Sequence, residues 1–572
     1  MNLLNILNAI FKYSPDKSYA FTLPETPEEQ MSNITRNTST APKENLIDET
    51  NQNIYDNLKD NLEYLKIKYN VLINSDIVIR EFTLTANDKE YKSFLIYIDG
   101  MIDSKMINDF VLKPLMLRNF SNTFVKENTK TVTISKNLKI CKIKRTKIDD
   151  YIYNSLIPQN TITKETQFSK IISDINSGNC ALFIDTVSSA FNIEVKGFKA
   201  RAVSEPNNEI VVHGSQEAFV ENIRTNTSLL RRIVNNENLV IESTSVGTIT
   251  RTKVAICYMK NIANDELVSE VKYRINNLGI DSLVSSGQLD QLIQDNSKIA
   301  DPQIISTERP DKAANHLLEG RVVVIVNGSP YVLIMPGLFM DFLSSPEDMN
   351  LKHQFANLLK AIRLIAAFFA LLLPGIYIAI TNYHQELIPT ELLFAISASR
   401  QTVPFPVFFE IILMEVSFEL IREAGLRVPS PMGATIGIVG ALILGEAAVN
   451  ANIVSPILII IVAITGICSF AIPDFSLSFS LRLWRFFYIL AGYLLGFLGI
   501  GFGLFVNFAL LLSLNSFGVP YFSPYAPVSN SNDESSLFLL PIWKRDKRAD
   551  FLNTKRIKSQ EKISRKWRNS LN

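Results

Sequence analysis

The stretch IRLIAAFFALLLPGIYIAI, from Ile362 to Ile380, decides the fold class of this chain. Only Arg363 near its start and Pro374 inside it interrupt an apolar run of about 19 residues, and about 20 residues of helix cross a hydrocarbon core of about 30 Å. A segment of this length and composition predicts a membrane-spanning helix. The rest of the sequence is therefore interpreted outward from a membrane segment.

Charged residues are unevenly distributed along the chain. The totals nearly cancel, at 57 Lys plus Arg against 56 Asp plus Glu, and this balance provides no net field that would attract nucleic acid. Charges crowd the residues before Ile362 and after Trp543, whereas the residues between Ile362 and Leu514 are mostly aliphatic, Phe or Gly. We expect a soluble domain, a membrane region and a basic tail, with no nucleic-acid partner.

Further apolar stretches follow the first. Met432 to Val449 and Ile453 to Phe470 each predict a span, and the linker between them suits only a hairpin. Phe486 to Leu514 is too long for one upright crossing and contains several glycines, including Gly492 and Gly496. This last stretch predicts either one steeply tilted helix or two half-helices. The region as a whole predicts an all-α multi-pass transmembrane bundle.

An acidic segment, PFPVFFEIILMEVSFELIREAG from Pro404 to Gly425, separates the first and second spans. On a helix, Glu415 and Glu419 share one flank with Arg422, and a charge at membrane depth costs a few kcal/mol unless it faces a bundle interior or water. The alternative is a helix lying flat at the interface with its acidic flank in water. We take as candidate pore or gating residues Glu410, Glu415, Glu419 and Glu446, together with Pro374 as a candidate hinge.

Basic residues indicate the topology. The tail from Trp543 to Asn572 has 11 Lys or Arg against 3 Asp or Glu, which predicts a cytoplasmic C-terminus. The arginine pairs at 422 and 427 and at 482 and 485 also favour the cytoplasmic side, and they reach it when the acidic segment crosses the membrane. An even number of crossings results. A four-span alternative keeps the tail inside but places all four arginines outside.

The soluble part predicts an α/β or α+β domain of two related subdomains, because short apolar runs alternate with stretches of helical period. FLIYIDGMIDSKMINDF from Phe94 aligns with VAICYMKNIANDELVSE from Val254 at an offset of about 160 residues. GNCALFIDTVSSAFNIEV from Gly178 aligns with GRVVVIVNGSPYVLIM from Gly320 at an offset of about 142 residues. The alternative is that any strand, turn and strand resemble another.

These observations divide the chain into five parts. They are an N-terminal segment with a disordered linker at 1–53, a first α/β subdomain at 54–200, a second at 201–345, a transmembrane region at 346–520 and a basic cytoplasmic tail at 521–572.

Motifs of catalysis and metal binding are absent from the sequence. There is no nucleophile elbow, P-loop or dinucleotide fingerprint in its required context, and the glycines of GFLGIGFG from Gly496 lie inside an apolar membrane stretch. Four scattered cysteines and four separated histidines lack the spacing of a metal site. We expect neither an enzyme nor a bound cofactor or metal.

Arg321 stands at the head of an otherwise apolar strand that precedes the turn residues Asn327 and Gly328. An arginine in this place can pair with an acidic residue of a neighbouring subunit. We therefore take Arg321 as a candidate subunit contact, with a purely structural role as the alternative.

Six runs of the sequence carry a resemblance to a known family. They are GRVVVIVNGSPYVLIMPGLFMDFLSSPEDM at 320–349, LLLPGIYIAITNYHQELIPTELLFAISASRQTVPFPVFFEIILMEVSFELIREAGLRVP at 371–429, GATIGIVGALILGEAAVNANIVSP at 433–456, IPDF at 472–475, RLWRF at 482–486 and SFGVPYFSPYAP at 516–527. From Gly320 onward the chain resembles the A subunit of the GerA-type germinant receptors of spore-forming bacteria.

That resemblance implies a function that composition does not show. It implies a multi-pass protein of the spore inner membrane, with its soluble domain and tail on the cytoplasmic, or core, side. It also implies partners, namely a transporter-like B subunit that recognises the nutrient, a lipoprotein C subunit and further A subunits. The A subunits would form an oligomer that conducts monovalent cations. A non-conducting scaffold or signalling subunit and the stage V sporulation relative that amplifies germination are the alternatives, and the triggering nutrient is left open.

Overall fold

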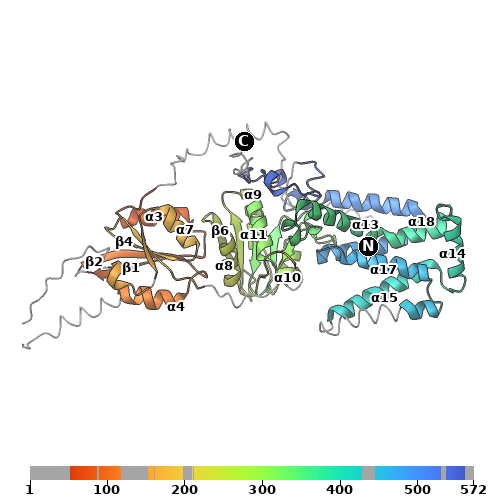
Figure 1. Cartoon of the computed structure of the whole chain (residues 1–572), viewed down its shortest axis with the longest axis horizontal. Helices are drawn as coiled ribbons and strands as arrows, with labels where there is room; N and C mark the ends of the chain where they lie inside the picture. The colour runs from red at the N-terminus through yellow and green to blue at the C-terminus, as the bar shows by residue number, and fades with distance from the viewer. Residues whose placement is uncertain are drawn as a thin grey trace, which may run out of the picture.

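The structure, a computed structural model, describes residues 52–86, 89–116, 152–159, 161–197, 206, 209, 211–427, 445–529 and 536–560. Two sheet-containing subdomains and a helical region follow one another along the long axis of the molecule (Figure 1). The N-terminal segment that was expected to be disordered lies outside the described residues, except for residues 52 and 53. The expected mixed α/β N-terminal part is confirmed, and the C-terminal part is helical with two apolar candidate spans.

The first subdomain is a five-stranded antiparallel sheet with helices on both faces. Its strand order is β1-β2-β4-β5-β3. One face carries α3 and α7, and the other carries α4 with two π-helical turns, η2 and η3. The elements are α3 Leu58–Lys68, β1 Ile77–Ala86, β2 Lys89–Ile98, α4 Ser104–Met106, η2 Ile107–Leu112, η3 Ile152–Leu156, β3 Ile162–Glu165, α7 Phe168–Asn176, β4 Cys180–Ile184 and β5 Ala190–Ile193.

The second subdomain repeats this arrangement. Its sheet has the order β6-β7-β9-β10-β8, which places its strands in the same sequence of neighbours as the first sheet. Helices α8 and α11 pack on one face, and α9 and α10 pack on the other. The elements are α8 Ile223–Ile233, β6 Leu239–Val246, β7 Thr252–Met259, α9 Asp265–Asn276, α10 Ser286–Ile293, β8 Ile305–Thr307, α11 Pro310–Glu319, β9 Val322–Val326 and β10 Val332–Met335.

Strand register corrects one detail of the repeat. Ser93 on β2 lies opposite Ile184, and Val254 on β7 lies opposite Val326. Because β4 and β9 correspond at the offset of 142, β2 and β7 correspond at 161 residues rather than at the 160 expected from the sequence. A slip of one residue exchanges the two faces of a strand, so the alignment of Phe94 with Val254 had placed the side chains on the wrong faces.

A buried ion pair joins the two subdomains. The guanidinium of Arg231 on α8 binds both carboxylate oxygens of Asp76, at 2.8 and 3.0 Å, and both side chains are almost fully buried. Beside it, the amide oxygen of Asn74 accepts a hydrogen bond from the backbone N–H of Ile241, at the edge of β6. The residues directly before β1 thus continue the hydrogen bonding of the second sheet at its β6 edge.

The helical region contains four long or apolar helices among the described residues. Helix α18 bends back at Gly496, whose φ of 61° and ψ of −140° interrupt the helix. A Cβ placed at Gly503 would lie 3.0 Å from the rings of Phe487 and Tyr488, so the two arms of α18 run side by side. The two half-helices that the sequence allowed are therefore confirmed. The elements are α13 His353–Tyr383, η6 Gln385–Leu387, α14 Thr390–Arg400, α15 Val407–Arg427, α17 Pro456–Phe470 and α18 Phe475–Ser513.

Hydrogen bonds at their ends give the directions of α13 and of the two arms of α18. Both ends of α18 reach the second subdomain, where Ser480 binds Asp301 at 2.7 Å and the backbone N–H of Phe517 binds Asp295 at 2.6 Å. At the far end, the hydroxyl of Tyr383 on α13 donates to the carbonyl of Tyr493 at 2.7 Å. Helix α13 and the first arm of α18 therefore run away from the subdomains, and the second arm returns.

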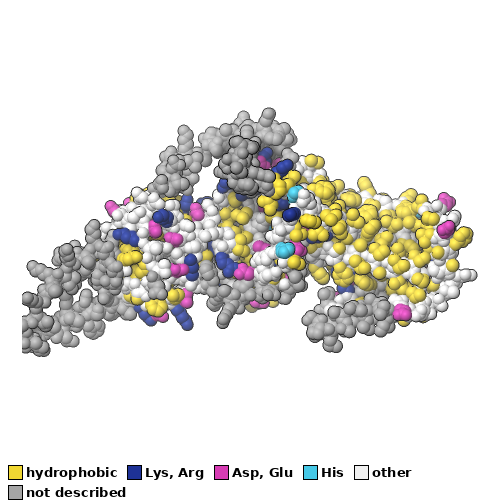
Figure 2. Space-filling view, viewed as in Figure 1, with side chains coloured by type: hydrophobic (Ala, Val, Ile, Leu, Met, Phe, Trp, Pro, Cys, Tyr) yellow, Lys and Arg dark blue, Asp and Glu magenta, His cyan; other side chains and the backbone are white. Residues whose placement is uncertain are grey.

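Two of these helices are long and apolar enough to cross a membrane by length and composition. They are α13 and α18, with hydropathies of 2.3 and 2.2 over their most apolar 18 residues, and α17 is apolar but has only 15 residues. The span expected at 432–449 lies outside the described residues up to 444, and residues 445–450 are helical. Figure 2 shows apolar side chains covering the visible face of the helical region, whereas charged side chains gather on the subdomains. An apolar surface of this extent is typical of a membrane or interaction surface.

The described part of the tail, 536–560, packs on the second subdomain. The backbone N–H of Lys555 binds the carbonyl of Ile262 at 3.0 Å, and Arg548 donates to the carbonyl of Leu318 at 2.7 Å. Phe551 and Leu552 are buried together in one hydrophobic cluster. The tail and the subdomains therefore lie on the same side of the helical region.

Candidate functional site

The acidic segment forms a straight helix whose charged flank faces the first arm of α18. Glu415 and Glu419 lie four residues apart on α15, and Arg482 and Arg485 lie three residues apart on α18, so each pair occupies one helix face. Arg485 binds Glu415 at 2.5 Å, and Arg482 binds Glu419 at 2.7 Å. Glu415 and Arg485 have side chains that are 0% exposed. The charged flank of α15 therefore faces neighbouring helices rather than water.

Glu419 is the centre of this network. Besides Arg482, it lies 3.4 Å from Arg422 on its own helix and 3.5 Å from Arg485. Arg422 also binds the hydroxyl of Ser469 on α17 at 2.5 Å and lies over the ring of Phe470, at 4.5 Å from its centroid. The charged side chains thus connect α15, α17 and α18 at the level nearest the subdomains. We call Glu415, Glu419, Arg422, Arg482 and Arg485 the helix network.

The helix network is incompletely bonded. Within the described residues, Oε1 of Glu415 and the Nε atoms of Arg422 and Arg485 have no hydrogen-bond partner, although all three atoms are buried. Taking paired charges out of water costs free energy, and that cost is offset only when the remaining polar atoms are also bonded. The network consequently retains bonding capacity that another arrangement of the same side chains, or a partner, can use.

The other candidate pore residues lie elsewhere. Glu410 is at the opposite end of α15, where its carboxylate accepts a hydrogen bond from the backbone N–H of Ser455 at 3.1 Å and lies 3.8 Å from Arg400. Glu446 is exposed on the helical residues 445–450. Pro374 is buried inside α13, next to Gly375. The structure therefore brings Glu415 and Glu419 together and separates Glu410 and Glu446 from them.

Glycine packing explains why α13 and α18 are close at the candidate hinge. A Cβ on Gly375 would lie 2.7 Å from the carbonyl oxygen of Tyr488, and a Cβ on Gly492 would lie 2.6 Å from the carbonyl oxygen of Gly375. The backbones of the two helices meet at this point, because glycine has no side chain to hold them apart. Pro374 thus stands beside a close backbone contact between α13 and α18.

Arg321 is bonded within its own chain, and its role as a subunit contact stays a prediction. Its buried guanidinium binds both oxygens of Asp341, at 2.5 and 3.1 Å, and the carbonyl of Pro336 at 2.8 Å. Burial acts to raise the pKa of Asp341, but the Arg321 guanidinium holds that pKa below its usual value. The arginine heading β9 thus ties the second subdomain to α12, Phe339–Phe342, and stabilises the fold.

The pairing of Arg482 and Arg485 with the acidic flank was missed at the level of sequence. Both had been interpreted only as topological signals. Two arginines three residues apart within an otherwise apolar helix carry the same cost of burial as the glutamates, and that shared cost was the signal for pairing them.

Comparison with known proteins gives the family. The profile described as "Bacillus/Clostridium GerA spore germination protein" matches residues 63–551. This chain belongs to that family. The match runs from α3 to η8, Asp550–Leu552, so the GerA family extends across both subdomains, the helical region and the packed part of the tail.

Relatives with similar sequences include spore germination proteins. Spore germination protein KA of Bacillus subtilis (strain 168) is 38% identical over 477 residues, covering 83% of this chain and 84% of the relative. Spore germination protein A1 of the same organism is 37% identical over 458 residues, covering 79% and 95%. The crystal structure of the N-terminal domain of the A subunit of the Bacillus megaterium spore germinant receptor GerK3 is 30% identical, covers 51% of this chain and 98% of that chain, and has a TM-score of 0.36.

Proposed function

We propose that this chain is the A-type membrane subunit of a nutrient germinant receptor that triggers spore germination. Membership of the GerA family supports the role in germination. The observation that carries the rest is the helix network, because charged side chains buried between apolar helices are maintained where a membrane protein transmits or gates.

The proposed topology places α13, α15, α17 and both arms of α18 across the spore inner membrane. With the span that the sequence predicts at 432–449, these helices make six crossings. An even number agrees with the packing of the tail on the second subdomain. The basic composition of that tail favours the cytoplasmic, or core, side for both.

The proposed mechanism is gated conduction of monovalent cations by an oligomer of this chain, assembled with a transporter-like B subunit and a lipoprotein C subunit. In the structure described, Glu415 and Glu419 are bound by arginines, so their negative potential is neutralised. We infer that this is a closed arrangement and that activation withdraws arginines from the glutamates. Glutamates released in this way repeat around an oligomer axis and attract cations.

The second candidate is a non-conducting signalling or scaffold subunit, and the same pairing favours it. If the helix network never opens, its role is to hold three helices in one rigid unit that passes a conformational change from its partners. A third candidate is the stage V sporulation relative, which amplifies germination without being a nutrient receptor.

Reconstitution separates conduction from signalling. The full chain with its B and C partners is placed in liposomes, and potassium and sodium efflux is followed as nutrients are added. Conduction predicts nutrient-dependent flux that falls or loses selectivity in Glu415→Gln, while the matched variant Glu266→Gln on the exposed surface of α9 leaves it unchanged. Absence of flux from a complex that still responds structurally to the nutrient would establish the signalling subunit.

The nutrient responses of spores that lack this chain distinguish a receptor subunit from an amplifier of germination. A receptor subunit predicts that the response to its own nutrient is lost while responses to other triggers persist. An amplifier predicts that every nutrient response slows to a similar extent.

A further inference from the structure

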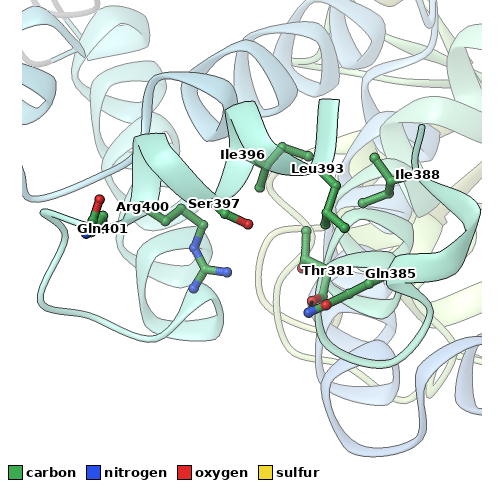
Figure 3. Close-up of a pocket in the computed structure, with 8 residues that line it drawn as sticks. All are labelled: Thr381, Gln385, Ile388, Leu393, Ile396, Ser397, Arg400 and Gln401. Atoms are coloured by element: carbon green, nitrogen blue, oxygen red, sulfur yellow. Dashed lines mark hydrogen bonds between the residues drawn. The ribbon is translucent and has the colours of Figure 1, made fainter. Parts of the chain in front are cut away.

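A polar pocket lies at the end of the helical region opposite the subdomains. It encloses about 250 Å³ between the end of α13, η6 and α14. Its polar side is formed by Thr381, Gln385, Ser397, Arg400 and Gln401. Figure 3 shows the Arg400 guanidinium extending from α14 into the pocket, with Thr381 and Gln385 on the other side of it.

Arg400 is incompletely bonded in this position, within the described part of the chain. Its Nε atom lies 3.8 Å from Oε1 of Glu410, which is too long for a hydrogen bond, and both atoms are buried without a partner among the described residues. The Arg400 side chain is 29% exposed and Glu410 is 1% exposed, so the guanidinium faces the opening. An arginine with unused donors attracts an oxyanion, and a planar carboxylate matches the geometry of its fork.

The remaining walls suit the rest of a small organic molecule. Ile388, Leu393 and Ile396 supply apolar contacts on one side. Gln385 is held in place because its side-chain amide donates to the carbonyl of Thr381 at 2.8 Å, which leaves its own oxygen to accept a hydrogen bond. At about 30 Å³ for each water-sized group, the pocket holds a solute of roughly eight non-hydrogen atoms.

We propose that this pocket binds a small solute bearing a carboxylate, with Arg400 as the residue that engages the anionic group and the aliphatic side chains covering its short apolar part. The site is reached from the side of the helical region away from the subdomains. This inference goes beyond the proposed function, because it concerns binding by this chain itself and requires no conduction.

Binding at this site also acts on the start of α17. The oxygen Oε2 of Glu410 accepts from the backbone N–H of Ser455, the N-cap of α17. A carboxylate ligand and the Glu410 carboxylate are both anions beside the same guanidinium, so they repel each other and compete for Arg400. Removing the charge of Glu410 therefore strengthens ligand binding, whereas a purely steric pocket is indifferent to it.

The test uses the full chain in maltoside micelles, which carry no anionic headgroup, and propionate as the probe. Saturation-transfer NMR measures the dissociation constant, with propionamide as the uncharged analogue of nearly equal shape. We expect propionate to bind at least tenfold more tightly than propionamide. Arg400→Gln should weaken propionate binding at least tenfold, Arg400→Lys should weaken it less, and Glu410→Gln should strengthen it several-fold.

A matched control variant distinguishes this pocket from nonspecific attraction of the anion to surface cations. Arg80→Gln, at an exposed position of β1, should leave propionate binding unchanged. Equal binding of propionate and propionamide, or equal binding by wild type and Arg400→Gln, would overturn the proposal. Loss of propionate binding when the chain is moved into phospholipid nanodiscs would also overturn it, because a lipid phosphate would then occupy Arg400.

Discussion

Arg321 in the second subdomain and Arg485 in the helical region are both fully buried arginines, but their carboxylate partners are bonded to different degrees. Asp341 uses both oxygens on Arg321, and one of them also accepts the backbone N–H of Leu338 at 3.0 Å. Glu415 uses one oxygen on Arg485, and its other oxygen is unbonded within the described residues. Nε of each arginine is unbonded within the described residues, so the difference lies in the carboxylates. We call Arg321 with Asp341 the complete pair because both oxygens of Asp341 are bonded, and a carboxylate bonded in this way fixes one structure, whereas the incomplete network permits exchange of partners.

The largest expected effect comes from breaking the complete pair. Asp341→Asn leaves the Arg321 charge in the core of the second subdomain, and we expect a loss of about 3–5 kcal/mol of unfolding free energy. Thermal unfolding of the purified full chain measures it. Asp265→Asn, which removes an exposed partner of Lys555, is the control and should change stability by no more than about 0.5 kcal/mol.

A substitution of Arg321 distinguishes a role in folding from a role in assembly. Arg321→Glu should lower the stability of the full chain and the yield of receptor complex together. Normal stability with reduced assembly would instead indicate that Arg321 contacts another subunit.

A smaller effect is expected from the incomplete network. Glu415→Gln leaves Arg485 with Glu419 at 3.5 Å as a replacement partner, so we expect a loss of about 1–3 kcal/mol rather than the full cost of an isolated buried charge. Arg485→Gln should cost more, because two glutamates then lose a cation. Membrane abundance and thermal unfolding of both single variants and the double variant form the cycle. Additive losses would mean that the two side chains are not coupled, contrary to the distances.

Glu319 tests whether the complete pair is influenced by a competitor, since it lies 3.6 Å from Arg321. Burial raises its pKa to about 7, with Arg321 opposing and Asp341 adding to the shift. Between its ordinary value of 4.5 and about 7, the unfolded state releases a proton that the folded state retains, so stability falls as pH rises through this window. We expect Glu319→Gln to remove a loss on the order of 2 kcal/mol between pH 4.5 and 7. Unfolding curves at several pH values measure it, and an unchanged slope would contradict the assignment.

The smallest effect is expected at Pro374. Because Gly375 and Gly492 already fix the close contact of α13 and α18, Pro374→Ala should change stability by less than about 1 kcal/mol and leave the nutrient response unaltered. Gly375→Ala is the matched change, and its Cβ would meet the Tyr488 carbonyl, so it should impair the response clearly. Spontaneous germination of Pro374→Ala spores at normal protein abundance would identify the proline as a hinge.

The sequence predicted features that depend on local pattern. The span at Ile362 to Ile380, the charged flank of the acidic segment and the break in the glycine-rich stretch all follow from the periodicity or composition of neighbouring residues. The reversal at Gly496 was one of two alternatives, because glycine permits a left-handed turn but does not require one.

Features that depend on distant contacts were not predicted. The partners of Glu415 and Arg321 lie 70 and 20 residues away, and no local period identifies them. The strand alignment was displaced by one residue because β2 and β7 are buried on both faces, so neither shows the alternation that would fix the register. The pocket beside Arg400 is formed by three separate elements and has no signature in any of them.

The return of α18 to the second subdomain has a consequence for biosynthesis. Tyr521 and Phe517 complete the two cores that flank the second sheet, although the last strand of that sheet ends at Met335. At a translation rate of about 5–20 residues per second, those cores wait roughly 10–40 seconds for their final side chains while the intervening helices are synthesised. Until then an apolar surface is open on the ribosome-bound chain, so we expect a chaperone to shield it. A truncation before residue 514 should leave that surface exposed permanently and direct the product to proteolysis.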